Sequence, residues 1–167
     1  MKLRLIFAFA FLTLAAIPSL GSESGKDVSH ISPDRALRAR VHTDDNGESS
    51  VRIEDTRSGA ILLIRDDTSS DGAHGYGVVH SAWTPDSQFF VAGLESTSDH
   101  PSWARPIWVY SRATNHVVEL WKIGLSVVAN FTLRPPDLLQ TRVLAPRSNG
   151  RRAGQALSVG LHSLLNR

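Results

Sequence analysis

Carboxylate and amide side chains in one short run have the composition of a metal site. The run Asp44-Asp45-Asn46-Gly47-Glu48 supplies several oxygen ligands of the kind that calcium prefers. It lacks the ligand spacing of an EF-hand loop, and an Asn-Gly pair between strand-like runs is a strong hairpin signal. We therefore expect a turn here and assign no metal or other cofactor. Asp44 and Asn46, with Asp66 further along, remain weak candidates for calcium.

Histidines are the next group with chemical potential. His74 lies in a polar, glycine-rich segment, Asp66 to Gly77, and His100 lies in a later loop. Neutral imidazole is a common metal ligand, but nothing in these spacings enforces a coordination geometry. His-Glu-x-x-His, Gly-x-Ser-x-Gly, Walker and Rossmann patterns are absent. We therefore assign no catalytic residue, while a carboxylate pair brought together only by folding stays open.

A proline-stiffened loop carries the best candidates for binding. Between Ser98 and Pro106 the chain holds Asp99, His100, Trp103 and Arg105. A tryptophan beside an arginine is typical of an interface anchor. The alternative is that Trp103 and Arg105 pack as a lid. We predict binding roles for these four residues and for His74.

Three evenly spaced Pro-Asp dipeptides indicate the elements that position these residues. They lie in Ser32-Pro33-Asp34, Thr84-Pro85-Asp86 and Pro135-Pro136-Asp137, at spacings of 52 and 51 residues. Proline fixes φ for a turn, and the Asp side chain can cap it. Each dipeptide therefore predicts a tight connection between two antiparallel strands.

Short β-branched or alternating runs surround each dipeptide. Two runs flank every Pro-Asp pair, and two more follow it in the first and second units. The predicted strands are 28–31, 37–41, 50–56 and 61–64, then 78–83, 89–94, 107–111 and 117–121, then 127–133, 138–144 and 156–161. Residues 155–166 fit a short amphipathic helix equally well. In the run 107–111, Trp108 and Tyr110 are expected on one buried face and Ile107 and Val109 on the other.

This pattern resembles the TolB-like, WD-repeat-like β-propellers of exported bacterial proteins, whose Pro-Asp repeats are similar. The residue after each Asp, usually glycine in that family, is here Arg35, Ser87 or Leu138. The resemblance implies an all-β fold of antiparallel, four-stranded, blade-like sheets. The units span about 28–65, 77–122 and 126–161, within one domain of residues 22–167. Two blades and part of a third cannot close a propeller, so we expect an open edge strand and possible homo-oligomerisation through it.

In a four-stranded meander, the loop between strands two and three emerges beside the connection from strand four to the next unit. The loops 43–49, 66–77, 96–105 and 122–126 are therefore expected on one side of the molecule. Loops on a rigid scaffold often carry binding residues. This geometry predicts a loop-rich binding face.

The first 21 residues have the order of a secretory signal peptide. Lys2 and Arg4 precede an apolar stretch that ends at Pro18, before the small residues Ser19 and Gly21. The stretch is short for a membrane span. We expect cleavage, no stable span afterwards, and a periplasmic or secreted protein. The chain has no cysteine, which excludes disulfides, thiolate metal sites and a lipobox anchor.

Charge places limits on the partner. Without Lys2 and Arg4, the 18 basic residues become 16, equal to the 16 acidic ones. Six arginines against Asp137 make residues 134–167 basic, but no aromatic residues interleave with them, so we do not expect nucleic acid. The sequence favours a non-catalytic interaction module that binds a protein or a cell-envelope polymer through the loop-rich face or the open edge. The alternative is an exported hydrolase-type enzyme with a carboxylate or calcium site on the same face.

Overall fold

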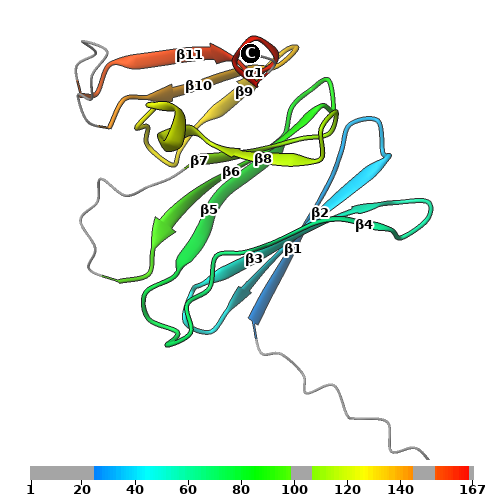
Figure 1. Cartoon of the computed structure of the whole chain (residues 1–167), viewed down its shortest axis with the longest axis vertical. Coiled ribbons are helices and arrows are strands. Elements are labelled where there is room, and N and C mark those ends of the chain that lie inside the picture. Colours follow the sequence, from blue (N-terminus) through cyan, green and yellow to red (C-terminus); the bar gives the residue numbers. More distant parts are fainter. Residues whose placement is uncertain (1–24, 99–106, 145–152, 166–167) are drawn as a thin grey trace, which may run out of the picture.

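The computed structural model describes residues 25–98, 107–144 and 153–165. They form three antiparallel sheets that lie one on another without closing into a barrel (Figure 1). The first sheet holds β1 (Gly25–Ile31), β2 (Leu37–Asp44), β3 (Ser49–Asp55) and β4 (Ile61–Asp66). The second holds β5 (Tyr76–Trp83), β6 (Phe89–Ser96), β7 (Ile107–Ser111) and β8 (His116–Glu119). The third holds β9 (Thr132–Arg134), β10 (Leu138–Arg142) and β11 (Ala156–Gly160). The predicted all-β fold of antiparallel sheets is confirmed, and the expected leader, residues 1–21, lies outside the described residues.

Every sheet is a meander in which sequence neighbours pair. The strand orders are β1-β2-β3-β4, β5-β6-β7-β8 and β11-β10-β9. Side chains alternate between the two faces of a strand, so each strand contributes one set of residues to the layer above it and another to the layer below. In the described residues no helix is long and apolar enough to cross a membrane.

The two central strands of the second sheet, β6 and β7, are buried on both faces because that sheet lies between the other two. Trp108 and Tyr110 of β7 pack toward the first sheet, while Ile107 and Val109 pack toward the third, as predicted. All four side chains are buried, and the same holds for Phe89 to Leu94 in β6. Burial of large apolar side chains on both faces is what holds the three layers together.

The first Pro-Asp corner is closed by its own side chains. Ser32 Oγ donates to Asp34 Oδ1 (2.6 Å) and accepts from the Leu37 amide (3.0 Å). Asp34 Oδ1 also accepts from the Ala36 amide (3.1 Å), so the carboxylate caps the turn as predicted. Arg35 lies in the left-handed region, with φ of 61°. The hydroxyl of Ser32, the carboxylate and a left-handed residue together turn β1 into β2.

The second corner repeats this arrangement. Thr84 Oγ1 donates to Asp86 Oδ1 (2.5 Å) and accepts from the Phe89 amide (3.0 Å). Asp86 Oδ1 accepts from the Gln88 amide (3.0 Å), and Ser87 has φ of 63°. The two corners are therefore equivalent turns, as their sequence spacing indicates.

The corners also connect one sheet to the next. The Asp34 amide donates to Ser87 Oγ (3.0 Å), and the Asp86 amide donates to the Pro136 carbonyl (3.3 Å). Asp137 of the third corner accepts from the His162 amide (2.6 Å), while His162 Nε2 lies 2.9 Å from Asp86 Oδ2. The first corner thus bonds to the second, and the second bonds to the third.

Four of the predicted strands are shorter than expected, and two of these, β10 and β11, simply end early, at Arg142 and Gly160. The fourth strand of the second sheet ends at Glu119, and Leu120–Ile123 forms a 3-10 helix, η1, closed by Gly124 in the left-handed region. Residues 127–131 form only an isolated bridge, Val127 to Val143, before β9 begins. For residues 155–166 a strand and a helix were the two predicted alternatives. Both occur in succession, because β11 leads directly into the short helix α1 (Leu161–Leu165).

Candidate functional site

The β2–β3 turn is a hairpin closed by Asp44. Asp44 Oδ1 accepts hydrogen bonds from the amides of Asn46 and Glu48, both at 2.9 Å. The Asp44 carbonyl accepts from the Gly47 amide (3.0 Å), and Gly47 has φ of 82°. The Asn-Gly pair is therefore a turn, as predicted, and it places the next residue, Glu48, toward the neighbouring loops.

Glu48 is the centre of the loop-rich end, and sequence reasoning did not single it out. Its side chain is fully buried, with 0% of the residue exposed. Oε2 accepts from the Ser69 amide (2.6 Å), and Oε1 lies 2.6 Å from the Gly75 amide. Oε1 also accepts from the hydroxyls of Ser69 (2.7 Å) and Thr97 (3.3 Å). One carboxylate thus joins the β2–β3 turn, the β4–β5 connection and the start of the β6–β7 loop.

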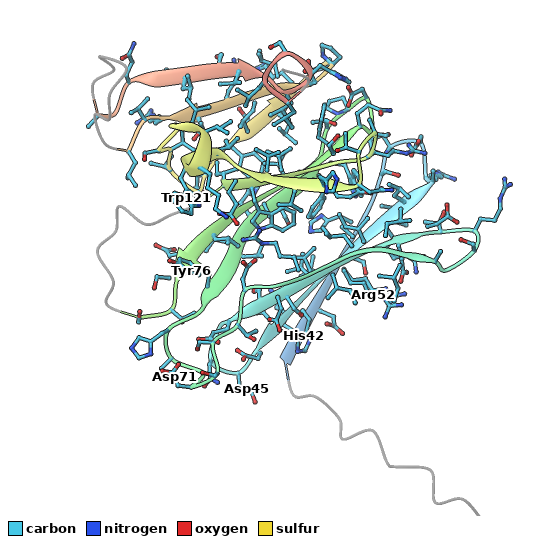
Figure 2. All side chains as sticks on the ribbon, viewed as in Figure 1. His42, Asp45, Arg52, Asp71, Tyr76 and Trp121 are labelled. Carbon is cyan, nitrogen blue, oxygen red and sulfur yellow. The ribbon has the colours of Figure 1, made fainter. Side chains whose placement is uncertain are left out.

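These three segments, residues 44–48, 67–75 and 97–98, are called the loop end below. Figure 2 shows Asp45 and Asp71 at this end, away from the third sheet. The predicted convergence is confirmed for the described residues of three of the four loops, 43–49, 66–77 and 96–105; the contacts of Glu48 do not include the fourth, 122–126. Asp99, His100, Trp103 and Arg105 follow directly after this end and lie outside the described residues.

The hydrogen bonds keep Glu48 ionised. The amide of Ser69 has the largest effect and lowers the pKa of the carboxyl group; burial opposes it, and the Ser69 hydroxyl and the Gly75 amide add to it. A carboxylate that accepts several N–H and O–H bonds is stabilised in its charged form. Glu48 therefore acts as an acceptor that holds loops and not as a proton donor.

Two glycines allow the loops to approach so closely. A Cβ atom at Gly75 would lie 2.5 Å from the Glu48 carboxyl carbon, and one at Gly77 would lie 2.3 Å from the Gly47 carbonyl oxygen. Both distances are shorter than atoms tolerate. The glycine-rich composition of this connection is thus required by the contact with the β2–β3 turn.

Ser69 organises the connection itself. Its Oγ accepts from the amides of Ala73 and His74, both at 3.1 Å, and lies 2.8 Å from Asp71 Oδ1. His74 Nδ1 is 2.5 Å from Asp71 Oδ2, and both side chains are exposed. The Ser69 hydroxyl and then the Ala73 amide and His74 lower the pKa of Asp71. His74 is thus paired with a carboxylate on the surface of the loop end.

The weak calcium candidates are occupied by local hydrogen bonds. Asp44 caps its own turn, and Asp66 Oδ1 accepts from the Thr68 amide (3.0 Å) and hydroxyl (2.8 Å). Asn46 lies against Gly72. No group of three or more His, Asp or Glu side chains with metal-binding geometry occurs among the described residues.

A second notable surface is the outer face of the first sheet, which faces away from the second sheet. Because Leu37, Ala39 and Val41 face the core, the residues between them face outward. There Glu54 accepts from Arg38 Nη1 (3.3 Å) and from Arg40 Nε (3.2 Å) and Nη2 (3.1 Å). Arg52 Nε lies 3.5 Å from its other oxygen. We call these four residues the arginine patch; Figure 2 shows Arg52 on this side.

The strand register arranges this face in rows. One row holds Ser29, Arg40, Arg52 and Ile64, and the next holds Ile31, Arg38, Glu54 and Ile61. A third row, nearer the loop end, holds Asp27, His42, Ser50 and Asp66. Sequence reasoning missed the patch, although the signal was present: alternation of apolar and charged residues over 37–41 and 51–54 places all four side chains on one face.

Comparison with protein-family models and with curated proteins finds no match for this chain.

Proposed function

We propose that this protein is an exported, non-catalytic interaction module, similar to the TolB-like propellers, that binds a protein or a cell-envelope polymer through its loop end. The observation that carries the proposal is the anchoring of that end by Glu48. Its bonds to Ser69, Gly75 and Thr97 fix three loops from two sheets before any partner arrives. Loops that are already ordered lose little conformational entropy on binding.

The chemistry of the loop end supports binding more than catalysis. The carboxylates of Asp44, Asp66 and Glu48 are engaged by turn and loop hydrogen bonds. A general acid or base needs a free position within reach of a substrate. Exposed polar groups such as Asp71 and His74 are suited to contact a partner at the rim of an interface.

Photo-crosslinking tests the binding surface. A photoreactive residue is placed at Asn46 or His74 in the loop end and, as a matched control, at Ser158 on the outer face of the third sheet. We expect a discrete crosslinked adduct in living cells from the two loop-end positions and none from Ser158. Adducts of equal yield from all three positions would contradict the proposal.

Substitutions separate an interaction module from an enzyme. Trp103→Ala and Arg105→Ala should remove the adduct, whereas Asp44→Asn, Asp66→Asn and His74→Gln should preserve it as long as the protein stays folded. The reverse pattern would favour a carboxylate-based enzyme. Cell fractionation with N-terminal sequencing tests export, with Ser22 expected as the first residue of the mature protein.

A further inference from the structure

The arginine patch has a charge arrangement that folding alone does not require. Arg40 lies directly opposite Arg52 in the β2–β3 register, and like charges placed opposite each other destabilise a sheet. The single carboxylate of Glu54 is shared among three guanidinium groups. The row with Arg40 and Arg52 and the row with Arg38 and Glu54 together therefore carry a net charge of two positive units.

The outer face of the third sheet, at the other end of the stack, is polar without such a like-charge pair. On the outer face of the third sheet, Arg134 Nε donates to Gln140 (2.8 Å), and Gln140 lies beside Ser158 (3.5 Å). Arg142 pairs with Ala156 across β10 and β11. Neither arginine of this face stands opposite another in the register. A polar terminal face therefore does not need the like-charge pair of the first sheet.

Exposed aliphatic side chains frame the patch on both sides. Ile31 is 53% exposed, Ile61 48% and Ile64 66%. They occupy the edge strands β1 and β4, in the same rows as the arginines. Apolar groups beside cationic ones are suited to a protein surface that combines carboxylates with aliphatic side chains.

We infer that the arginine patch is a docking surface for a protein partner that presents acidic residues at alternate positions of an extended strand, with aliphatic side chains beside that strand. In such a strand, residues on one side recur about every 7 Å, which matches the separation of Arg38 and Arg40 along β2. Guanidinium groups bind carboxylates through paired N–H bonds. Glu54 holds the arginines in place, so they are positioned before the partner arrives.

The third row of the face favours a protein over a uniform polyanion. Asp27 lies 2.9 Å from His42 there, and Asp66 stands at the same level. These carboxylates repel a polymer with evenly spaced negative charges, whereas a protein can place its acids opposite the arginines alone. A second copy of this chain is disfavoured as well, because two patches facing each other bring like charges together.

Binding of a designed peptide tests the inference. The probe is a fluorescein-labelled peptide of alternating glutamate and valine, titrated with the purified full-length protein and followed by fluorescence anisotropy at low salt. We expect binding, and a loss of affinity of about tenfold or more in Arg40→Glu/Arg52→Glu. The matched control, Arg134→Glu/Arg142→Glu, makes the same change in net charge on the third sheet and should stay within about twofold of the wild type.

A second variant keeps the test decisive if the charge reversal prevents folding. Arg40→Lys/Arg52→Lys retains the charge but not the paired donors, and we expect a loss of several-fold with an unchanged melting temperature. Equal losses in the patch and control variants, or no binding by the wild type, would overturn the inference. Patch-dependent binding of dextran sulfate without binding of the peptide would overturn it in favour of a polyanion. Self-association that disappears in the patch variant would overturn it in favour of a second copy.

Discussion

A carboxylate fully shielded from water is costly to keep ionised unless donors surround it. Glu48 meets this condition through the amides of Ser69 and Gly75 and the hydroxyls of Ser69 and Thr97. Because these donors belong to segments of two different sheets, removing the carboxylate charge affects the attachment between the sheets as well as the turn.

The stability of the protein should therefore depend on pH through Glu48. Its pKa in the folded state is lowered from 4.5, mainly by the Ser69 amide. A lowered pKa means that the stabilisation is present above about 4.5 and is lost as pH falls toward the folded-state value. Glu48→Gln should lower the melting temperature at pH 7, and the difference from the wild type should shrink at pH 3. Thermal unfolding at both pH values measures this; a constant difference would contradict it. Glu95→Gln, a change at a partly exposed glutamate, is the control.

A second single-residue prediction concerns backbone strain at Arg35. This exposed residue has φ of 61°, which glycine adopts without cost. Arg35→Gly should stabilise the protein by about 0.5–1 kcal/mol in urea denaturation, because relief of strain outweighs the added freedom of the unfolded chain. Arg57→Gly, at another exposed turn position but without a positive φ, should be neutral or destabilising. Destabilisation by Arg35→Gly would show that the arginine side chain supports the corner.

Residue-level contacts were only partly predictable from the sequence. The hairpin at Asn46-Gly47 follows from local turn chemistry. The role of Glu48 does not, because its partners, Ser69, Gly75 and Thr97, lie 21 to 49 residues away. The arginine patch, in contrast, follows from the alternation of residues within β2 and β3 alone.

At the scale of elements, the two equivalent corners provide an internal comparison. The first uses a serine hydroxyl and the second a threonine hydroxyl for the same two bonds. Thr84→Val should destabilise the protein by about 1–3 kcal/mol, because the buried Phe89 amide loses its acceptor. Thr84→Ser should cost less than about 1 kcal/mol, since the hydroxyl remains. If both variants lost the same free energy of unfolding in urea, the methyl group of Thr84 would matter as much as its hydroxyl, which would contradict the prediction.

Strands were predictable where a local pattern specifies them. Turn residues and alternation mark the pairs around Ser32 to Asp34 and Thr84 to Asp86, and these strands occur within a few residues of the expected bounds. Residues 127–131 were mistaken for a strand because Val127 and Phe131 are apolar. Both are buried in the core between the second and third sheets, and within residues 127–131 the pairing is limited to the bridge from Val127 to Val143, so their hydrophobicity reflects packing more than strand pairing.

At the scale of the whole molecule, the central layer differs from the two outer ones. Both faces of β6 and β7 are apolar, whereas the outward faces of the first and third sheets carry Arg40, Arg52, Arg134 and Gln140. Polar outer faces on terminal units end a stack of repeats. Side-chain chemistry thus limits the stack of three sheets at its two ends.

Removing the charges from one end should therefore allow the stack to continue. In Arg38→Leu/Arg40→Leu/Arg52→Leu/Glu54→Leu, the four new leucines join Ile31, Ile61 and Ile64 in a continuous apolar face. The face measures about 20 Å on each side, so two copies would bury an area near the lower limit for stable interfaces, ~1,000 Å². We expect a two-fold symmetric dimer with an affinity in the micromolar range, seen as a concentration-dependent mass in sedimentation velocity. Hydrogen exchange should show new protection in the first sheet and none in the third. A folded variant with the same mass as the wild type at every concentration would show that charge is not what ends the stack.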